Sequence, residues 1–463
     1  MTVRRAAFVG IVAASVVAIF PAVASAHGIG GRQDLPVPLS FFIGGAALAI
    51  VISFVVLAYL WPSPRLQEGP LNTPIRAMWL GPVLTVLKWV ALIAMLLVIL
   101  DGLLDGRGSP THISPVLVWV FFWLVFPYVV AVTGNLWKFA SPWRTLGNWI
   151  NGSVPERYDI AARIGMWPAT VTFISFTWLE LVSPTSGEPS TLAIATLVYT
   201  TFILIVTRFT GVETGLGTTE AFENYNMVIS AIAPFDIERA APSVGTATTI
   251  VKPAVSWRGW LRALPVLPDR PGMTWFVLAT IGTVTYDGLS QTTWWAELFG
   301  AETVRQVWFG TIALPAMVLV VGAGYFIASW SASHLAPESG VSTRKVAARF
   351  IHTLVPIALA YAFSHYFTLV IFEGQRIIHA ASDPFGFGWN LFGTANWRVV
   401  FFLAPLAVWW IQLIMIVAGH IAGTVLAHDR ALTDFGKDAI RSQYAMLVLM
   451  VSFTSLGLFI LAG

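Results

Sequence analysis

Runs of about 20 apolar residues, separated by polar connections, recur along almost the whole chain. A helix needs about 20 such residues to cross the ~30 Å of hydrocarbon in a bilayer, and helices satisfy their own backbone polar groups there. Ten runs meet this length, at roughly 39–61, 83–105, 115–136, 160–183, 190–210, 272–290, 306–331, 346–372, 398–425 and 442–462. The pattern predicts an all-α fold, a polytopic transmembrane helix bundle of about ten spans.

The amino terminus has the features of a secretory signal peptide. Arg4 and Arg5 precede an apolar run that ends at Phe20, and the small residues 24–26 follow. This order of charge, apolar run and small-residue site predicts a signal peptide over residues 1–26, cleaved to leave His27 first. An uncleaved anchor is the alternative, and it also places residue 27 outside. Residues 27–463 are expected to form a single transmembrane helical domain.

The distribution of basic residues agrees with ten spans. With residue 27 outside, the inner connections and their flanks hold 18 of the 26 Lys and Arg residues, and the outer ones hold five. Cytoplasmic connections are usually the richer in Lys and Arg. We therefore expect a multi-pass protein of the plasma membrane with both mature termini outside and an inner-face loop over residues 211–271.

Composition narrows the class of protein and its partners. Hydrophobic residues make up 57% and charged residues 11%, against about 25% charged in soluble domains, so a soluble enzyme is excluded. The absence of cysteine excludes disulfides and thiolate chemistry. The net charge of +3 gives no reason to expect a nucleic-acid partner. The expected partners are the lipid bilayer, a small apolar substrate and, as an open alternative, other membrane subunits.

Ionisable residues inside apolar spans are candidates for chemistry, because their burial in lipid is costly. Asp101 ends the second predicted span, Asp287 ends the sixth, and His365 lies in the eighth. The predicted topology brings all three toward the outer membrane face. We expect these three catalytic candidates to converge in one outward-facing cavity, where carboxylate and imidazole could act as acid and base.

A second group at the same face has the residue types of a metal site. It comprises His27, His112, Glu373 and His379. Imidazole and carboxylate ligands suit a divalent ion such as zinc or manganese, and a terminal His27 with its free amine would favour copper. A divalent metal ion is therefore one candidate cofactor. The alternative is that the carboxylates cap helix ends and the histidines fill the interface.

Two further histidines lie in the inner half of the predicted bundle. His352 begins the eighth span and His420 lies late in the ninth. Facing histidines can hold a haem, and hydrogen bonds between helices are the other interpretation. We expect that packing role and no haem.

Clusters of small residues predict close helix packing, and interleaved aromatic residues predict a segment in the membrane interface. The clusters at 44–47 and 419–423 suit close helix packing. Tryptophans 137, 143 and 149 alternate with basic residues, which is typical of a segment lying in the membrane interface. An irregular loop with aromatic anchors is the alternative for that segment.

Several stretches together resemble a known family. They are the sequence HGIGGRQDLP at 27–36, TYDG at 285–288, SHYF at 364–367, ASDPFG at 381–386 with LFG at 391–393, and Gly419-His420. They resemble bacterial integral-membrane proteins known as fenitrothion hydrolases, over nearly the whole chain. The resemblance implies hydrolysis of an organophosphate ester of the phosphotriester type at an outer-face site. Metal handling or transport, and a non-catalytic place in a membrane complex, are the alternatives.

Overall fold

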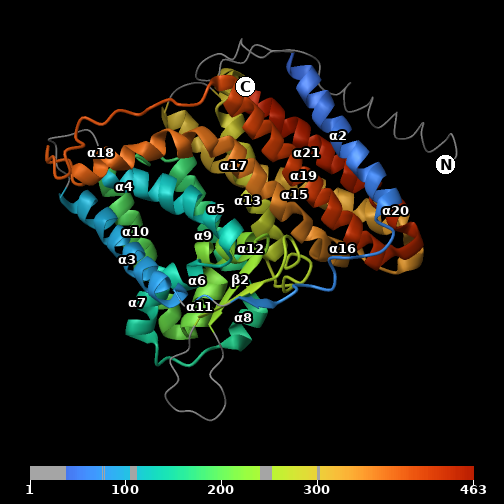
Figure 1. Ribbon diagram of the computed structural model, residues 1–463, viewed down its shortest axis with the longest axis horizontal. Coiled ribbons are helices and arrows are strands. Elements are labelled where there is room, and N and C mark those ends of the chain that lie inside the picture. Colours follow the sequence, from blue (N-terminus) through green and yellow to red (C-terminus); the bar gives the residue numbers. More distant parts are fainter. Residues whose placement is uncertain are drawn as a thin grey trace. The chain divides into compact units, whose positions relative to one another are not determined.

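A computed structural model describes residues 38–75, 77, 79–104, 112–239, 253–299 and 303–462 (Figure 1). The predicted signal peptide and His27 lie outside the described residues. The chain divides into two compact units. The first comprises Met1–Gln67, Val277–His365 and Leu403–Gly463, and the second comprises Glu68–Phe276 and Tyr366–Phe402.

All the regular elements in the described part of the first unit are helices. Two of its helices, α13 and α17, cross the unit boundary along the chain. The elements of this unit are α2 (Leu39–Leu60), α13 (Met273–Ser290), α14 (Thr293–Phe299), α15 (Thr303–Leu335), η2 (Pro337–Ser339), α16 (Thr343–Phe350), η3 (Ile351–Leu354), α17 (Val355–Ile371), α19 (Pro405–Phe435), η5 (Gly436–Asp438), α20 (Ala439–Ser442) and α21 (Tyr444–Ala462).

Helices α2, α19 and α21 pack side by side in the first unit (Figure 1). Phe42 of α2 meets Trp409 of α19 edge to face, with ring centroids 5.4 Å apart. Leu458 of α21 completes this apolar contact and is fully buried. The buried carboxylate of Asp429 accepts hydrogen bonds from Trp61 Nε1 and Gln67 Nε2, at 2.9 and 2.8 Å. This carboxylate fastens the segment that follows α2 to α19.

Close packing of α19 depends on two of its glycines. A Cβ on Gly419 would lie 2.3 Å from Ala360 Cβ, and one on Gly423 would lie 2.8 Å from the Thr353 carbonyl oxygen. The cluster at 419–423 therefore packs as expected against η3 and α17. In the cluster at 44–47, Ala46 is buried against α19, but Gly44 and Gly45 have nothing within 4 Å of an added Cβ.

The second unit consists of shorter helices and a small sheet. Its elements are β1 (Thr73–Ile75), α3 (Leu80–Leu104), α4 (Ile113–Pro115), the π-helical η1 (Val116–Val125), α5 (Phe126–Thr133), α6 (Trp137–Ala140), α7 (Pro142–Asn151), α8 (Tyr158–Ile164), α9 (Trp167–Leu181), α10 (Pro189–Thr210), α11 (Val212–Thr219), α12 (Ala221–Ser230), β2 (Phe235–Arg239), β3 (Pro253–Trp257), η4 (Glu373–Gln375) and α18 (Arg376–Ser382).

The sheet is antiparallel and has the strand order β1–β3–β2. Trp257 of β3 lies opposite Thr73 on one side and Phe235 on the other. Both neighbouring strands come from connections between apolar runs. Apart from this sheet, the regular elements of the described chain are all helices, as the hydrophobic pattern predicts.

Eight helical segments of the described residues are long and apolar enough to cross a bilayer. They are Leu39–Leu60, Leu80–Leu104, Ile113–Thr133, Pro189–Thr210, Arg305–Leu335, Thr343–Ile371, Pro405–Ser442 and Tyr444–Leu461. These are the helices of a multi-pass integral membrane protein. Ten spans stay a prediction, because the other two predicted runs form helices that fall short of this length or apolarity.

The fourth and sixth predicted runs differ for separate reasons. Residues 160–183 are split into α8 and α9 at Gly165, which has a φ of +52°. A side chain there would also meet the Pro271 carbonyl oxygen at 2.2 Å. Residues 273–290 do form one helix, α13, but threonines and Asp287 lower its apolarity.

The aromatic segment at 137–149 is largely buried. Trp137 and Trp143 are 3% and 6% exposed, and both pack against Phe122 of η1. Trp149 is 57% exposed. The first two tryptophans thus pack inside the protein, and the position of the segment in the membrane interface stays a prediction.

Candidate functional site

Asp287 and His365 form a carboxylate–imidazole pair in the first unit. Asp287 lies near the end of α13 and His365 near the middle of α17. His365 Nε2 is 2.8 Å from Asp287 Oδ2. The Asp287 side chain is 9% exposed and that of His365 is 17% exposed. The carboxylate is thus buried, while the imidazole keeps partial access to its surroundings.

Neighbouring residues hold this pair in place. Tyr361 lies one helical turn before His365, and the two rings meet at 65° with centroids 6.4 Å apart. Gly288 follows Asp287 and lets α13 approach α21, because a Cβ there would lie 1.9 Å from Ile460 Cγ2. The same Cβ would lie 3.6 Å from His365 Cε1. Helix packing therefore fixes the orientation of the imidazole.

The contact defines a proton arrangement that is suited to acid–base chemistry. An ionised carboxylate only accepts hydrogen bonds, so Asp287 receives the Nε2–H of His365. A neutral imidazole then carries its lone pair on Nδ1. A carboxylate that orients an imidazole and stabilises its protonated form is the arrangement of a general base.

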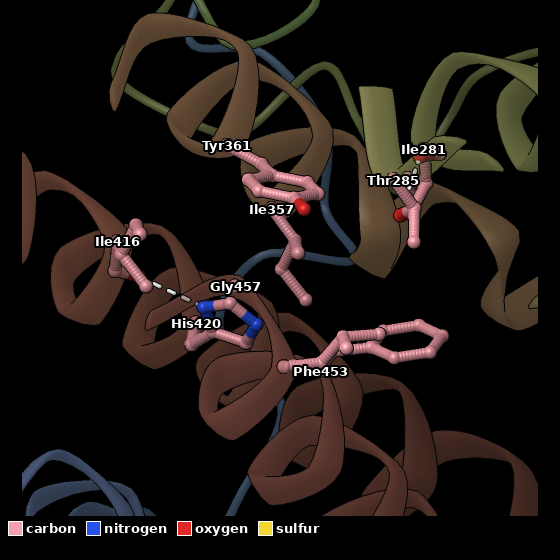
Figure 2. A pocket seen from close by; sticks show the side chains of 9 residues that line it. Ile281, Thr285, Ile357, Tyr361, Ile416, His420, Phe453 and Gly457 are labelled. Atoms are coloured by element: carbon pink, nitrogen blue, oxygen red, sulfur yellow. Dashed lines mark hydrogen bonds between the residues drawn. The ribbon is translucent and has the colours of Figure 1, made fainter. Parts of the chain in front are cut away.

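A small cavity of about 10 Å³ lies nearby in the first unit (Figure 2). It is lined by Thr285 of α13, Tyr361 of α17 and His420 of α19, together with apolar residues. His420 Nε2 is buried without a hydrogen-bond partner among the described residues. The volume is about that of one water-sized probe, so this cavity suits a single water and not a substrate.

The two inner histidines bond to their own helical segments. His352 Nδ1 is 2.7 Å from the Arg349 carbonyl oxygen, and His420 Nδ1 is 2.8 Å from that of Ile416. Both side chains are buried. The predicted hydrogen-bond role is present, but the prediction of bonds between helices is wrong. In both cases the acceptor is a backbone carbonyl three or four residues earlier in the same helical segment.

Asp101 pairs with His112 in the second unit. Asp101 is completely buried, and its Oδ1 lies 2.8 Å from His112 Nδ1. Its Oδ2 accepts from Ser114 N at 3.0 Å and from Ser114 Oγ at 2.6 Å. The carboxylate thus joins the end of α3 to the start of α4. Asp101 belongs to a different unit from Asp287 and His365, and convergence of all three stays a prediction.

Glu373 and His379, two of the four metal candidates, line a cavity of about 320 Å³ in the second unit. Arg376 and Arg398 line it as well, and Arg376 forms an ion pair with Glu373. His112 contacts Asp101 as described, and His27 lies outside the described residues. Among the residues that the structure describes, no three His, Asp or Glu side chains are grouped to hold a metal ion. Metal binding stays a prediction.

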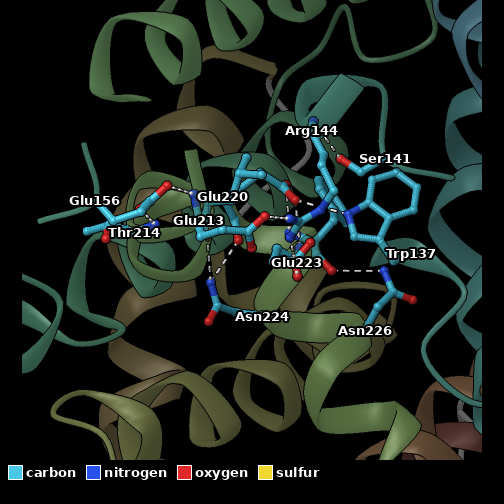
Figure 3. A network of polar contacts seen from close by, with 12 residues as sticks. Trp137, Ser141, Arg144, Glu156, Glu213, Thr214, Glu220, Glu223, Asn224 and Asn226 are labelled. Atoms are coloured by element: carbon cyan, nitrogen blue, oxygen red, sulfur yellow. Dashed lines mark hydrogen bonds and ion pairs between the residues drawn. The ribbon is translucent and has the colours of Figure 1, made fainter. Parts of the chain in front are cut away.

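Sequence reasoning missed a buried ionic network in the second unit (Figure 3). Arg144 of α7 is 7% exposed and forms ion pairs with Glu213 of α11 and Glu223 of α12. The second contact, from Nη2 to Oε1, is 2.9 Å. Burial alone would lower the pKa of Arg144, but the two glutamates raise it above its ordinary value. Arg144 therefore stays charged.

Glu220 is the most enclosed carboxylate of this network. It caps α12 by accepting from the backbone N–H groups of Phe222 and Glu223. Trp137 Nε1 and Tyr199 Oη also donate to it, at 3.1 and 3.0 Å. Burial raises the pKa of Glu220 to about 7, although these hydrogen bonds act in the opposite direction. The group can therefore change its protonation near neutral pH.

One signal in the sequence could have identified this network. The stretch 211–226 contains three glutamates and two asparagines within a chain that is only 11% charged. The hydrophobic pattern assigns the stretch to a loop, because no apolar run of spanning length covers it. Arg144 lies 69 residues before Glu213, so no local pattern joins the two.

Comparison of the chain with protein-family models, curated proteins and solved structures finds no match. Membership of the fenitrothion hydrolase family is therefore a proposal.

Proposed function

We propose that the chain is an integral-membrane hydrolase of apolar organophosphate esters of the phosphotriester type. His365 acts as the general base, and Asp287 orients it. The observation that carries the proposal is the 2.8 Å contact between a buried carboxylate and a partly accessible imidazole. The residues of this pair belong to two of the stretches that resemble the fenitrothion hydrolases, TYDG at 285–288 and SHYF at 364–367.

The proposed reaction needs one proton acceptor close to a bound water. His365 Nδ1 takes a proton from that water as its oxygen attacks phosphorus. The bond from phosphorus to the leaving oxygen breaks, and the proton on Nδ1 is returned to that oxygen. The products are a phosphodiester and an alcohol or phenol. Asp287 stabilises the imidazolium that exists between the two proton transfers.

The location of the pair in a membrane protein favours an apolar substrate. A neutral triester partitions into hydrocarbon, and the helices that carry the pair belong to a multi-pass membrane protein. The charged diester product leaves toward water, because burial of an unpaired charge is costly.

The experiment is a hydrolysis assay on the full-length chain reconstituted in lipid. Chromogenic phosphotriester, phosphodiester and carboxylic esters are compared, and the metal content of the protein is measured. We expect release of product from the triester and a rate that a chelator does not change. Failure to hydrolyse any of the esters contradicts the proposal. A rate that is lost with the chelator and restored by a divalent ion would instead favour metal chemistry.

A further inference from the structure

The cavity of about 320 Å³ in the second unit is large enough for a small molecule. It lies in the connection between the candidate spans Thr343–Ile371 and Pro405–Ser442. Its lining consists of Glu373, Arg376, His379, Trp397, Arg398, Val399 and Phe401. Because the connection joins the ends of two candidate spans, the cavity is expected at the level of the lipid headgroups.

Charge in this cavity favours an anion. Glu373 is paired with Arg376 Nε, which leaves the two terminal nitrogens of that guanidinium as donors. Arg398 makes no ion pair with any residue that the structure describes. With Glu373 neutralising one arginine, Arg398 gives the cavity a net positive charge. That charge attracts a phosphate and opposes a divalent cation.

The wall that carries Arg398 is held against the start of α18. Gln375 Nε2 donates to the Val400 carbonyl oxygen, and the Val400 N–H donates to Gln375 Oε1, both at 3.0 Å. Thr394 Oγ1 donates to the Ile378 carbonyl oxygen at 2.6 Å. These contacts hold the segment 394–400 at its first and last residues. The arginine is therefore presented from a preorganised wall, which lowers the entropic cost of binding.

Aromatic side chains on this wall add an apolar component. Trp397 is 42% exposed and Phe401 is 73% exposed, and both line the cavity. The neighbouring Phe402 is 63% exposed. Aromatic residues are enriched at the headgroup level of membranes, where one part of the ring meets hydrocarbon and the other meets water. A ligand in this cavity thus meets cationic donors and an apolar surface together.

We propose that this cavity binds the phosphate group of an amphipathic phosphate ester. Arg398 and the terminal nitrogens of Arg376 donate to the phosphate oxygens, since guanidinium groups match phosphate geometry. Phe401 and Trp397 contact the apolar chain. The phosphate comes either from a lipid headgroup or from a soluble phosphate, and the experiment distinguishes the two. The proposal does not rest on the proposed hydrolysis.

The experiment measures binding to the purified full-length chain by calorimetry. The probes are short-chain phosphatidic acid, short-chain phosphatidylcholine and inorganic phosphate. We expect phosphatidic acid to bind most tightly, and Arg398→Gln to weaken it about tenfold or more, the usual loss for one charge-assisted hydrogen bond. Arg398→Lys should bind at an intermediate level. The matched control is Arg305→Gln, which removes an exposed arginine from another helix end and should bind as the wild type does.

The other outcomes distinguish a lipid headgroup from a soluble phosphate, or overturn the proposal. Phe401→Ser should weaken phosphatidic acid without changing inorganic phosphate, which would identify the lipid headgroup as the source. Equal binding of both phosphates, lost together in Arg398→Gln, supports the same site for a soluble phosphate. The proposal is overturned when no phosphate binds, when folded Arg398→Gln binds as the wild type does, or when manganese binds and is lost in His379→Ala.

Discussion

His365 Nε2 lies 2.8 Å from Asp287 Oδ2, across 78 positions of sequence and between two helices, α17 and α13. Both side chains are mostly buried. A buried carboxylate in hydrogen-bond contact with an imidazole fixes the tautomer of the ring. The contact between α13 and α17 therefore sets which imidazole nitrogen can accept a proton, which an apolar contact between helices would not do.

Replacement of Asp287 by asparagine should disturb this tautomer. The side-chain amide of the variant can donate to His365 Nε2, which would move the ring proton to Nδ1, the atom that the reaction needs as an acceptor. We expect Asp287→Asn to lower kcat by about 100-fold or more, with little change in KM, as for orienting carboxylates in other hydrolases. Steady-state kinetics on the triester check this. The proposed role for Asp287 is rejected when the variant retains the kcat of the wild type.

The topology can be tested with reporter fusions at residues 250 and 463. Ten spans place residue 250 inside and residue 463 outside. Without spans at 160–183 and 272–290, residue 250 would also face out. We expect opposite sides, because the basic residues between 211 and 271 favour the inner face. Helix α13, with 18 residues, is about 27 Å long, close to the hydrocarbon thickness. Reporters on the same side would exclude ten spans.

The surroundings of Gly419 in α19 and of Gly45 in α2 predict different effects of an added methyl group. Gly419→Ala places a methyl group 2.3 Å from Ala360 Cβ, and overpacking of this kind costs about 1–3 kcal/mol. Gly45→Ala meets nothing within 4 Å and should leave stability unchanged or slightly raised, since alanine favours helix. Thermal unfolding in one detergent compares the two. A Gly419→Ala variant as stable as the Gly45→Ala variant would refute the close contact.

Glu220 should make stability depend on pH. Its pKa is raised from 4.5 to about 7 by burial. A raised pKa means that the folded state holds the proton more tightly, so this stabilising contribution is fully present below about pH 4.5. It is lost as the pH rises through about 7. We expect the wild type to lose more stability than Glu220→Gln between pH 5 and pH 8, as measured by thermal unfolding.

The control for this comparison is Glu338→Gln. Glu338 is 68% exposed and is paired with Lys437, so its replacement should leave the pH dependence of the wild type. Should Glu220→Gln show that same pH dependence, another group would be responsible.

Patterns in the sequence predict the helical class, which the structure confirms, and mark Asp287 and His365 as candidates for chemistry. Polar side chains in apolar runs are costly, so Asp287 and His365 stood out before any contact was known. The expected convergence is met by Asp287 and His365, but the direct hydrogen bond between them could not be predicted. Two positions 78 residues apart come together only through the packing of α13 and α17, which no local pattern encodes.

Small-residue clusters and aromatic residues beside basic ones are each compatible with more than one structure. Glycines 45 and 419 both lie in small-residue clusters, but only the second meets a neighbouring helix. Trp143 lies beside Arg144 and is nevertheless buried. The charge of Arg144 is compensated inside the protein, because it pairs with the buried Glu223 of α12 and the half-exposed Glu213 of α11. Such partners are supplied by tertiary packing, and no local periodicity reveals them.

The most direct measurement of the central claim is kcat/KM for a chromogenic phosphotriester with the wild type and His365→Ala, both reconstituted in lipid. His334→Ala is the matched control, because His334 is exposed and bonds to the Trp330 carbonyl oxygen of its own helix. We predict that His365→Ala loses at least about 100-fold, the usual contribution of a general base, while His334→Ala keeps the wild-type rate. Equal rates in wild type and His365→Ala, with both proteins folded, would contradict the account.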